Sequence, residues 1–184
     1  MASGLTEYES LYQEREGVSV PAVGSDLEYG DDQPAGDEVA AMHDLALRLL
    51  SRRDHSRREL AAKLLGKGYP AAGVIGVLDD LAATGLQSDE RMADAYVNER
   101  LRRGFGPLRI RQELRERGVA EEVIQACLDL PPGDWLALMD GVATRKFGLA
   151  KAGERKEVAR RARFLEYRGF PTELIGRYLR GVCP

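Results

Sequence analysis

The sequence predicts an all-α protein in which three tandem three-helix units follow an acidic amino-terminal tail. A glycine followed by an apolar residue recurs at Gly68, Gly118 and Gly169, which are 50 and 51 residues apart. Each glycine has a leucine four residues before it (Leu64, Leu114, Leu165) and a valine or isoleucine six residues after it (Val74, Ile124, Ile175). No segment alternates apolar and polar residues for long enough to indicate a strand. Such repetition is typical of stacked helical units.

The charge of the chain is distributed unevenly along the sequence. Residues 1–44 carry eleven acidic side chains and one basic one, whereas residues 45–184 carry 26 basic and 19 acidic ones. The net charge of −3 therefore conceals a positively charged folded part. Residues 1–37 are acidic, glycine-rich and without periodicity, so we expect a disordered tail, with room for one short helix over 7–15.

The first unit is expected over residues 38–85, with helices at 38–53, 56–67 and 70–84. Ser56 and Glu59 have the spacing of a capping box, which predicts that the middle helix begins there. Gly68 is expected to end that helix, and Pro70 to start the next one, where its missing N–H costs nothing.

The second unit is expected over residues 86–130, with helices at 88–103, 107–117 and 120–129. Gly104, Gly106 and Pro107 predict a tight turn that opens the middle helix, which Gly118 ends.

The third unit is expected over residues 131–184, with helices at 134–147, 154–168 and 171–181. Asp134 is predicted to cap its first helix, Gly169 to end its middle helix, and Pro171 to repeat the role of Pro70. Three short helices per unit are the smallest all-helical arrangement with a closed core of its own.

The sequence offers no recognisable active site. His43 and His55 have no carboxylate or cysteine at ligand spacing, and we expect His55 to be an exposed neighbour of a helix cap. Cys127 is expected to be a small core residue, and with Cys183 it forms neither a disulfide framework nor a zinc motif. No phosphate loop, nucleophile elbow or zincin motif occurs, so we expect no enzyme activity, metal or cofactor.

The same features predict where the protein works. The amino terminus has no secretory signal, and no apolar stretch approaches the roughly 20 residues that a membrane span needs. Together with the sparse cysteines, this predicts a cytoplasmic protein without a membrane contact.

Arginines supply the candidate binding residues, since 22 of the 27 basic side chains are arginine. In the helix at 107–117, Glu113 is spaced to pair with both Arg109 and Arg117. Arg111 and Arg115 share another face with no acidic residue four positions away, and an arginine-rich stretch precedes the turn (Arg100, Arg102, Arg103).

The helix at 154–168 carries a second basic row. Its predicted buried stripe is Val158, Ala162 and Leu165, and its basic row consists of Lys156, Arg160 and Arg163, followed by Tyr167. Either row could be a solvated face, or a surface for phosphate or for an acidic protein groove.

Several blocks resemble the bacterial RecX family of regulatory proteins. Its central block is similar to Arg100-Leu101-Arg102-Arg103-Gly104-Phe105-Gly106-Pro107-Leu108-Arg109-Ile110, and Ser56-x-x-Glu59-Leu60 resembles its first unit. Its third unit is similar to Ala143-Thr144-Arg145-Lys146-Phe147-Gly148 and to Arg163-Phe164-Leu165-x-x-Arg168-Gly169-Phe170.

The resemblance implies an elongated, curved array of three-helix units that binds the RecA filament in its helical groove. Restraint of ATP hydrolysis, strand exchange and repressor self-cleavage by RecA is implied as well, with DNA as a second contact. The candidate contacts are Arg100, Arg102, Arg103, Arg109, Arg111, Arg115, Arg145, Lys146, Lys156, Arg160, Arg163, Tyr167 and Arg168. We expect the protein to be a monomer.

Two other functions remain open from the residues themselves. One is a DNA-binding regulator that uses a three-helix unit as a helix-turn-helix, and the other is a helical scaffold for an unrelated acidic partner. The acidic tail could compete with a partner for the basic helix faces or have no effect.

Overall fold

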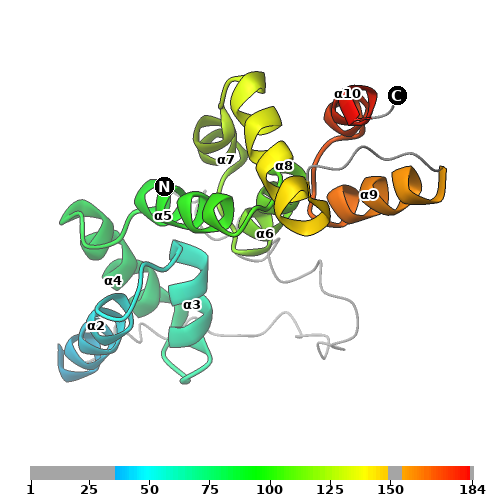
Figure 1. The fold of residues 1–184 in the computed structure, drawn as a ribbon. Coiled ribbons are helices and arrows are strands. Elements are labelled where there is room, and N and C mark those ends of the chain that lie inside the picture. The colour runs from blue at the N-terminus through cyan, green and yellow to red at the C-terminus, as the bar shows by residue number, and fades with distance from the viewer. Residues whose placement is uncertain (1–35, 149–154, 183–184) are drawn as a thin grey trace, which may run out of the picture. The chain divides into compact units, whose positions relative to one another are not determined.

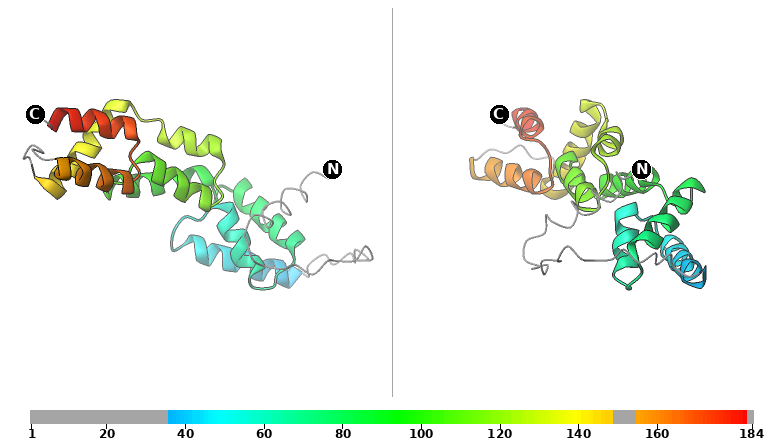
Figure 2. Two further views of the ribbon diagram at one scale, coloured as in Figure 1. Left: turned by 90° about the vertical axis from the view of Figure 1, so that its right-hand side faces the viewer. Right: turned by 180° about the vertical axis from the view of Figure 1, so that it is seen from behind.

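The computed structural model describes residues 36–148 and 155–182, and all regular secondary structure within these ranges is helical (Figure 1, Figure 2). The described helices follow one another along the chain in the predicted order. The predictions of a disordered tail, of a helix over 7–15 and for Cys183 lie outside the described residues, apart from positions 36 and 37.

The first helical group contains α2 (Gly36–Leu50), α3 (Arg57–Leu65) and α4 (Ala71–Ala83), which pack against one another. Ser56 and Glu59 form the predicted capping box, since the Ser56 Oγ accepts a hydrogen bond from the Glu59 amide at 3.0 Å. The apolar stripes of these helices are buried, with Leu60, Leu64 and Leu78 fully enclosed.

The second helical group contains α5 (Asp89–Arg102), α6 (Pro107–Glu116) and α7 (Glu121–Leu128). The third helical group contains α8 (Pro132–Phe147), α9 (Arg155–Tyr167) and α10 (Thr172–Val182). Helices α9 and α10, orange and red in the figures, pack against each other and against α8 (Figure 1).

Glycine ends the middle helix of each group, as predicted. Gly68, Gly118 and Gly169 have φ values of 89°, 76° and 85°, a left-handed conformation that a side chain disfavours. The repeat that dominates the sequence therefore marks the same backbone turn three times.

Two predicted helix starts differ from the structure. Asp134 does not cap α8, because Pro131, with ψ of 140°, already ends the extended segment and the helix starts at Pro132. The Asp134 carboxylate lies in the first turn instead, where the helix dipole favours a negative charge. Pro70 is the residue before α4 rather than its first residue.

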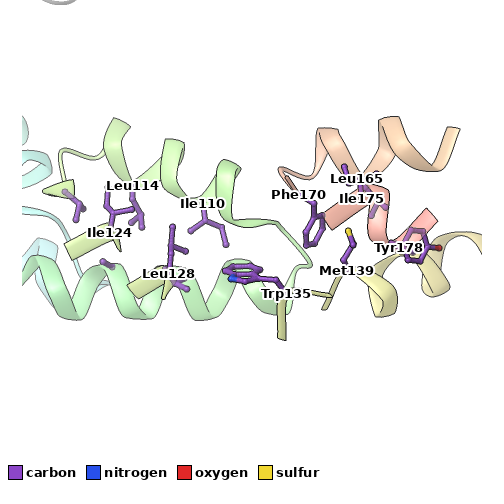
Figure 3. Close-up of a cluster of buried hydrophobic side chains, with 14 of the residues drawn as sticks. Ile110, Leu114, Ile124, Leu128, Trp135, Met139, Leu165, Phe170, Ile175 and Tyr178 are labelled. Atoms are coloured by element: carbon purple, nitrogen blue, oxygen red, sulfur yellow. The ribbon is translucent and has the colours of Figure 1, made fainter. Parts of the chain in front are cut away.

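The second and third helical groups share one hydrophobic core, whereas a closed core for each unit was predicted. The shared cluster extends from Met92 in α5 to Tyr178 in α10. Figure 3 shows Trp135, at the start of α8, between the side chains of α6 and α7 and those of α9 and α10. Within the described residues the cluster contains no side chain of α2, α3 or α4.

Candidate functional site

The predicted basic face of α6 is neutralised by the next helix. Arg115 Nε lies 2.7 Å from Glu121 Oε2, and Arg111 pairs with the same carboxylate and with Gln125 at 2.7 Å. The hydrogen bond from Arg115 holds the pKa of Glu121 below its usual value. No acidic residue lies four positions from either arginine, as the sequence indicates, but Glu121 reaches both from α7.

Glu113 joins α5 to α6 through two arginines. Its carboxylate lies 3.0 Å from Arg109 Nε and 2.7 Å from Arg100 Nε, and it accepts a hydrogen bond from the Tyr96 hydroxyl at 2.8 Å. Burial raises the pKa of Glu113, but the hydrogen bonds from Arg109 and Tyr96 outweigh this effect and lower the pKa below its usual value. The carboxylate therefore stays charged.

Phe105 is surrounded by guanidinium groups from the second and third helical groups. The guanidinium carbons of Arg109, Arg168 and Arg100 lie 4.6, 5.2 and 5.4 Å from its ring centre. Arg168 also donates hydrogen bonds to the carbonyls of Arg103, at 2.6 Å, and of Gly104, at 3.3 Å. These arginines therefore connect α5, α6 and α9.

Arg117 connects the first and second helical groups. It pairs with Glu59 of α3 and its guanidinium carbon lies 4.5 Å from the ring centre of Tyr96, so the predicted pair with Glu113 was wrong. Sequence spacing could not reveal this partner, which is 58 residues away in the chain. The Arg117 carbonyl accepts a hydrogen bond from the Ser56 hydroxyl at 2.6 Å.

His55 contacts Glu59 of this connection. It was predicted to be exposed, but it is buried. Only 4% of its surface is accessible, and its Nδ1 lies 3.2 Å from Glu59 Oε2. Burial, together with the charge of Arg53, lowers the pKa of His55 although Glu59 opposes the shift. The burial of His55 and its contact with Glu59 indicate a structural role.

The third helical group contains several exposed cations that lack an ion pair with any described residue. They include Arg145 and Lys146 at the end of α8 and Lys156 and Arg163 on α9. Arg102 is similarly exposed in α5, whereas Arg103 pairs with Glu99 at 2.6 Å.

Helix α9 presents its basic row with a different inner face from the one predicted. Leu165 is buried, but Val158 and Ala162 are only half-buried, and Arg161 is 3% exposed and pairs with Glu157 at 3.1 Å. Arg160 shares Glu157 at 2.8 Å yet remains 64% exposed. Tyr167, at the end of the row, is 76% exposed.

The numbers of charged side chains also distinguish the second helical group from the third. Residues 88–131 contain eight basic and nine acidic side chains, whereas residues 132–184 contain eleven basic and six acidic ones. Of these two groups, only the third therefore has an excess of positive charge. We call Arg145, Lys146, Lys156, Arg160, Arg163 and Tyr167 the basic surface.

No described group of His, Cys, Asp or Glu could hold a metal ion, and no described helix has the length and apolar character of a membrane span. Cys127 packs against the core, and burial, with Asp94 adding to it, raises the pKa of its thiol to about 11. A thiol that is protonated at neutral pH is a poor nucleophile.

The helices define a class of proteins built from tandem three-helix units. Comparison with family models then matches "RecX, first three-helix domain" to residues 43–81, "RecX, second three-helix domain" to 88–128 and "RecX, third three-helix domain" to 134–179.

Curated relatives agree with the family models. Regulatory protein RecX of Halorhodospira halophila is 46% identical over 141 residues, which are 77% of this chain and 88% of that protein. Regulatory protein RecX of Pseudomonas savastanoi pv. phaseolicola is 40% identical over 145 residues, covering 79% and 94%.

A solved structure has the same fold. The crystal structure of RecX from Lactobacillus salivarius matches with a TM-score of 0.72 at 18% identity, covering 80% of this chain and 98% of that chain.

The chain belongs to the RecX family of regulatory proteins. The predicted family and all-α class are thus confirmed. The family is one of non-enzymatic regulators, and membership implies interaction with the RecA recombinase.

Proposed function

We propose that this protein is a cytoplasmic monomer that binds the RecA–DNA filament in its groove through the basic surface. Binding there restrains ATP hydrolysis, strand exchange and repressor self-cleavage by RecA. Family membership supports the partner, and the observation that carries the choice of surface is the row of exposed cations on α9 that ends at Tyr167. Arginine and lysine attract phosphate and carboxylate groups, both of which a nucleoprotein filament offers.

The structure changes which of the predicted contacts support this proposal best. Arg100, Arg109, Arg111, Arg115 and Arg168 hold helices together, so their side chains are less available to a partner. For the same reason a duplex-DNA reader built on α6 is the weaker alternative. Arg102 and Arg103 remain candidates at the edge of the second helical group.

The test measures DNA-dependent ATP hydrolysis by RecA during a titration with the protein. We expect inhibition at substoichiometric amounts, and Lys156→Glu with Arg163→Glu should raise the half-inhibiting concentration by about tenfold, because two attractive charges become repulsive.

The matched control is Arg48→Glu with Lys63→Glu, which changes the net charge equally at exposed positions of the first helical group. Equal inhibition by both double variants would exclude the basic surface. Absence of inhibition by the unmodified protein across a wide titration would contradict the proposed function itself.

A further inference from the structure

The turns that end α3, α6 and α9 share a positive φ at their glycine and one hydrogen bond. In each, the glycine amide donates a hydrogen bond of 2.8–2.9 Å to the carbonyl three residues earlier, in Leu65, Arg115 and Glu166. We call these turns the glycine corners, and each consists of a basic residue and its glycine: Lys67–Gly68, Arg117–Gly118 and Arg168–Gly169. The turns after α6 and α9 also carry a hydrogen bond from the Val119 and Phe170 amides to the Leu114 and Leu165 carbonyls. Because the Gly68 corner shares the glycine bond and the positive φ with them, we expect it to accept the same kind of contact.

The Gly118 corner is covered by the first turn of α3. The Ser56 hydroxyl donates to the Arg117 carbonyl at 2.6 Å, and the Arg117 side chain pairs with Glu59. A Cβ atom at Gly118 would lie 2.3 Å from the Cδ of Arg58. Glycine is therefore required here by close approach as well as by its φ angle.

The Gly169 corner is covered by the first turn of α6 in the same manner. The Gly106 amide donates to the Arg168 carbonyl at 2.8 Å, and the Leu108 amide donates to the Gly169 carbonyl at 3.0 Å. A Cβ atom at Gly169 would lie 2.4 Å from the Cβ of Arg109. Ser56 lies eight residues before Leu64 and Gly106 eight residues before Leu114, so equivalent helix starts fill both corners.

The Gly68 corner is open among the described residues. Gly66, Lys67 and Gly68 are exposed, and a Cβ atom added at Gly68 would meet nothing within 4 Å. No described residue donates a hydrogen bond to the carbonyl of Lys67 or Gly68. Gly66 also replaces the larger side chains at the equivalent positions 116 and 167, which leaves more of the backbone uncovered.

We infer that the Gly68 corner is a third docking site of this type and that it binds the first turn of a helix from a partner protein. The filled Gly118 corner defines the chemistry of this occupant. Its first residue carries a Ser or Thr hydroxyl for the Lys67 carbonyl, and a glutamate three residues later pairs with the Lys67 ammonium, as Glu59 pairs with Arg117.

In a second copy of this chain, the Ser56–Glu59 helix start has this chemistry, but it already fills that copy's own Gly118 corner. The equivalent turn of α9 begins at Glu157 and places Arg160 where α3 has Glu59. Glu157 also lies inside α9, which begins at Arg155, so α9 offers no helix start with a Ser or Thr hydroxyl at this point. The Gly68 corner is thus a site for a different protein, separate from the basic surface and independent of the function proposed for it.

Nuclear magnetic resonance of the full chain can test this site with a blocked peptide of residues 54–65, which contains the Ser56–Glu59 helix start. We expect the amide signals of Gly66, Lys67 and Gly68 to shift, while those of Gly118 and Gly169 stay unchanged. Lys67→Glu should weaken binding by about two- to fivefold, the range of one exposed ion pair. A peptide with Glu59→Lys should restore affinity for the Lys67→Glu protein.

Two controls separate the outcomes. Lys146→Glu, an exposed change of the same charge in the third helical group, should leave peptide binding unaltered. Shifts that are absent at millimolar peptide, or that are insensitive to both charge reversals, would overturn the inference. Deletion of residues 1–35 should also leave the Gly66–Gly68 signals in place, since a change there would identify the chain's own amino-terminal segment as the occupant.

Discussion

At the scale of single residues, close packing explains glycines that backbone conformation does not. Gly106 has φ of −87°, which any residue can adopt, yet a Cβ atom there would lie 2.4 Å from the Gly169 carbonyl oxygen and 2.6 Å from the Phe170 amide nitrogen. Both obstacles are backbone atoms, which cannot rotate away as a side chain can.

Gly106→Ala should therefore lower the free energy of unfolding by about 1–3 kcal/mol through steric conflict between α6 and the turn after α9. Urea unfolding followed by circular dichroism measures the change. Gly76→Ala is the control, because Gly76 lies inside α4 with nothing within 4 Å of the added Cβ, and it should stabilise by about 0.5–1 kcal/mol. Equal effects of the two substitutions would contradict the close-contact explanation.

His55 should make stability depend on pH near neutrality. Its pKa is lowered in the folded protein by burial and by Arg53, so the unfolded chain takes up a proton first as the pH falls. The associated stability is complete above the unfolded value of about 6.5 and is lost as the pH falls through the folded pKa. Unfolding in urea at pH 7.5, 6.5 and 5.5 should show this loss.

His55→Gln should remove that dependence between pH 7.5 and 5.5. Glu59, whose pKa is lowered despite its burial by the hydrogen bond from Arg53 and the charge of Arg117, loses its contribution only below about 4.5. An unchanged slope in the His55→Gln protein would assign the effect to another group.

At the scale of elements, ion pairs between helices decide which arginines are available. Arg111 and Arg115 are on the same face of α6, but α7 packs beside that face and brings Glu121 to both. Among the ion pairs of the described residues, the row on α9 meets one carboxylate, that of Glu157, which Arg160 and Arg161 share.

Arg111→Glu with Arg115→Glu should therefore destabilise the contact between α6 and α7, because three carboxylates would then gather at one point. We expect a lower midpoint of urea unfolding, and we expect Glu121→Arg in the same protein to raise the midpoint again. If the double substitution left the midpoint unchanged and weakened RecA binding, Arg111 and Arg115 would instead belong to the binding surface.

At the scale of the whole described chain, two kinds of contact join the helical groups. The first and second groups meet through polar contacts around Glu59 and Arg117, whereas the second and third share a hydrophobic core around Trp135. An apolar core couples the unfolding of the helices that contribute to it, because each loses its packing partners when another unfolds.

Trp135→Ala should reduce amide protection in α5–α7 as well as in α8–α10, with an overall loss of about 3–5 kcal/mol. Hydrogen exchange with mass spectrometry resolves the effect by helix. Leu78→Ala, within the first helical group, is the comparison and should reduce protection mainly in α2–α4. If the loss from Trp135→Ala stays within α8–α10, the second and third groups unfold independently.

The sequence by itself determined the helices, their order and their glycine stops. These follow from local causes, namely apolar spacing, the Ser56 capping box and the positive φ that Gly68, Gly118 and Gly169 provide. The family also followed from contiguous motifs. The start of α8 was misplaced because Pro131 and Asp134 both carry signals for a helix start.

Only the tertiary structure decided which arginines are exposed and which hold the molecule together. Arg117 and Glu59 are 58 residues apart, and Arg168 reaches Arg103 across 65 residues, so no spacing within one helix predicts either contact. Charge on a helix face is a local property, but its neutralisation depends on what packs against that face. The physical reason is that an ion pair requires proximity in space, which the chain establishes only by folding.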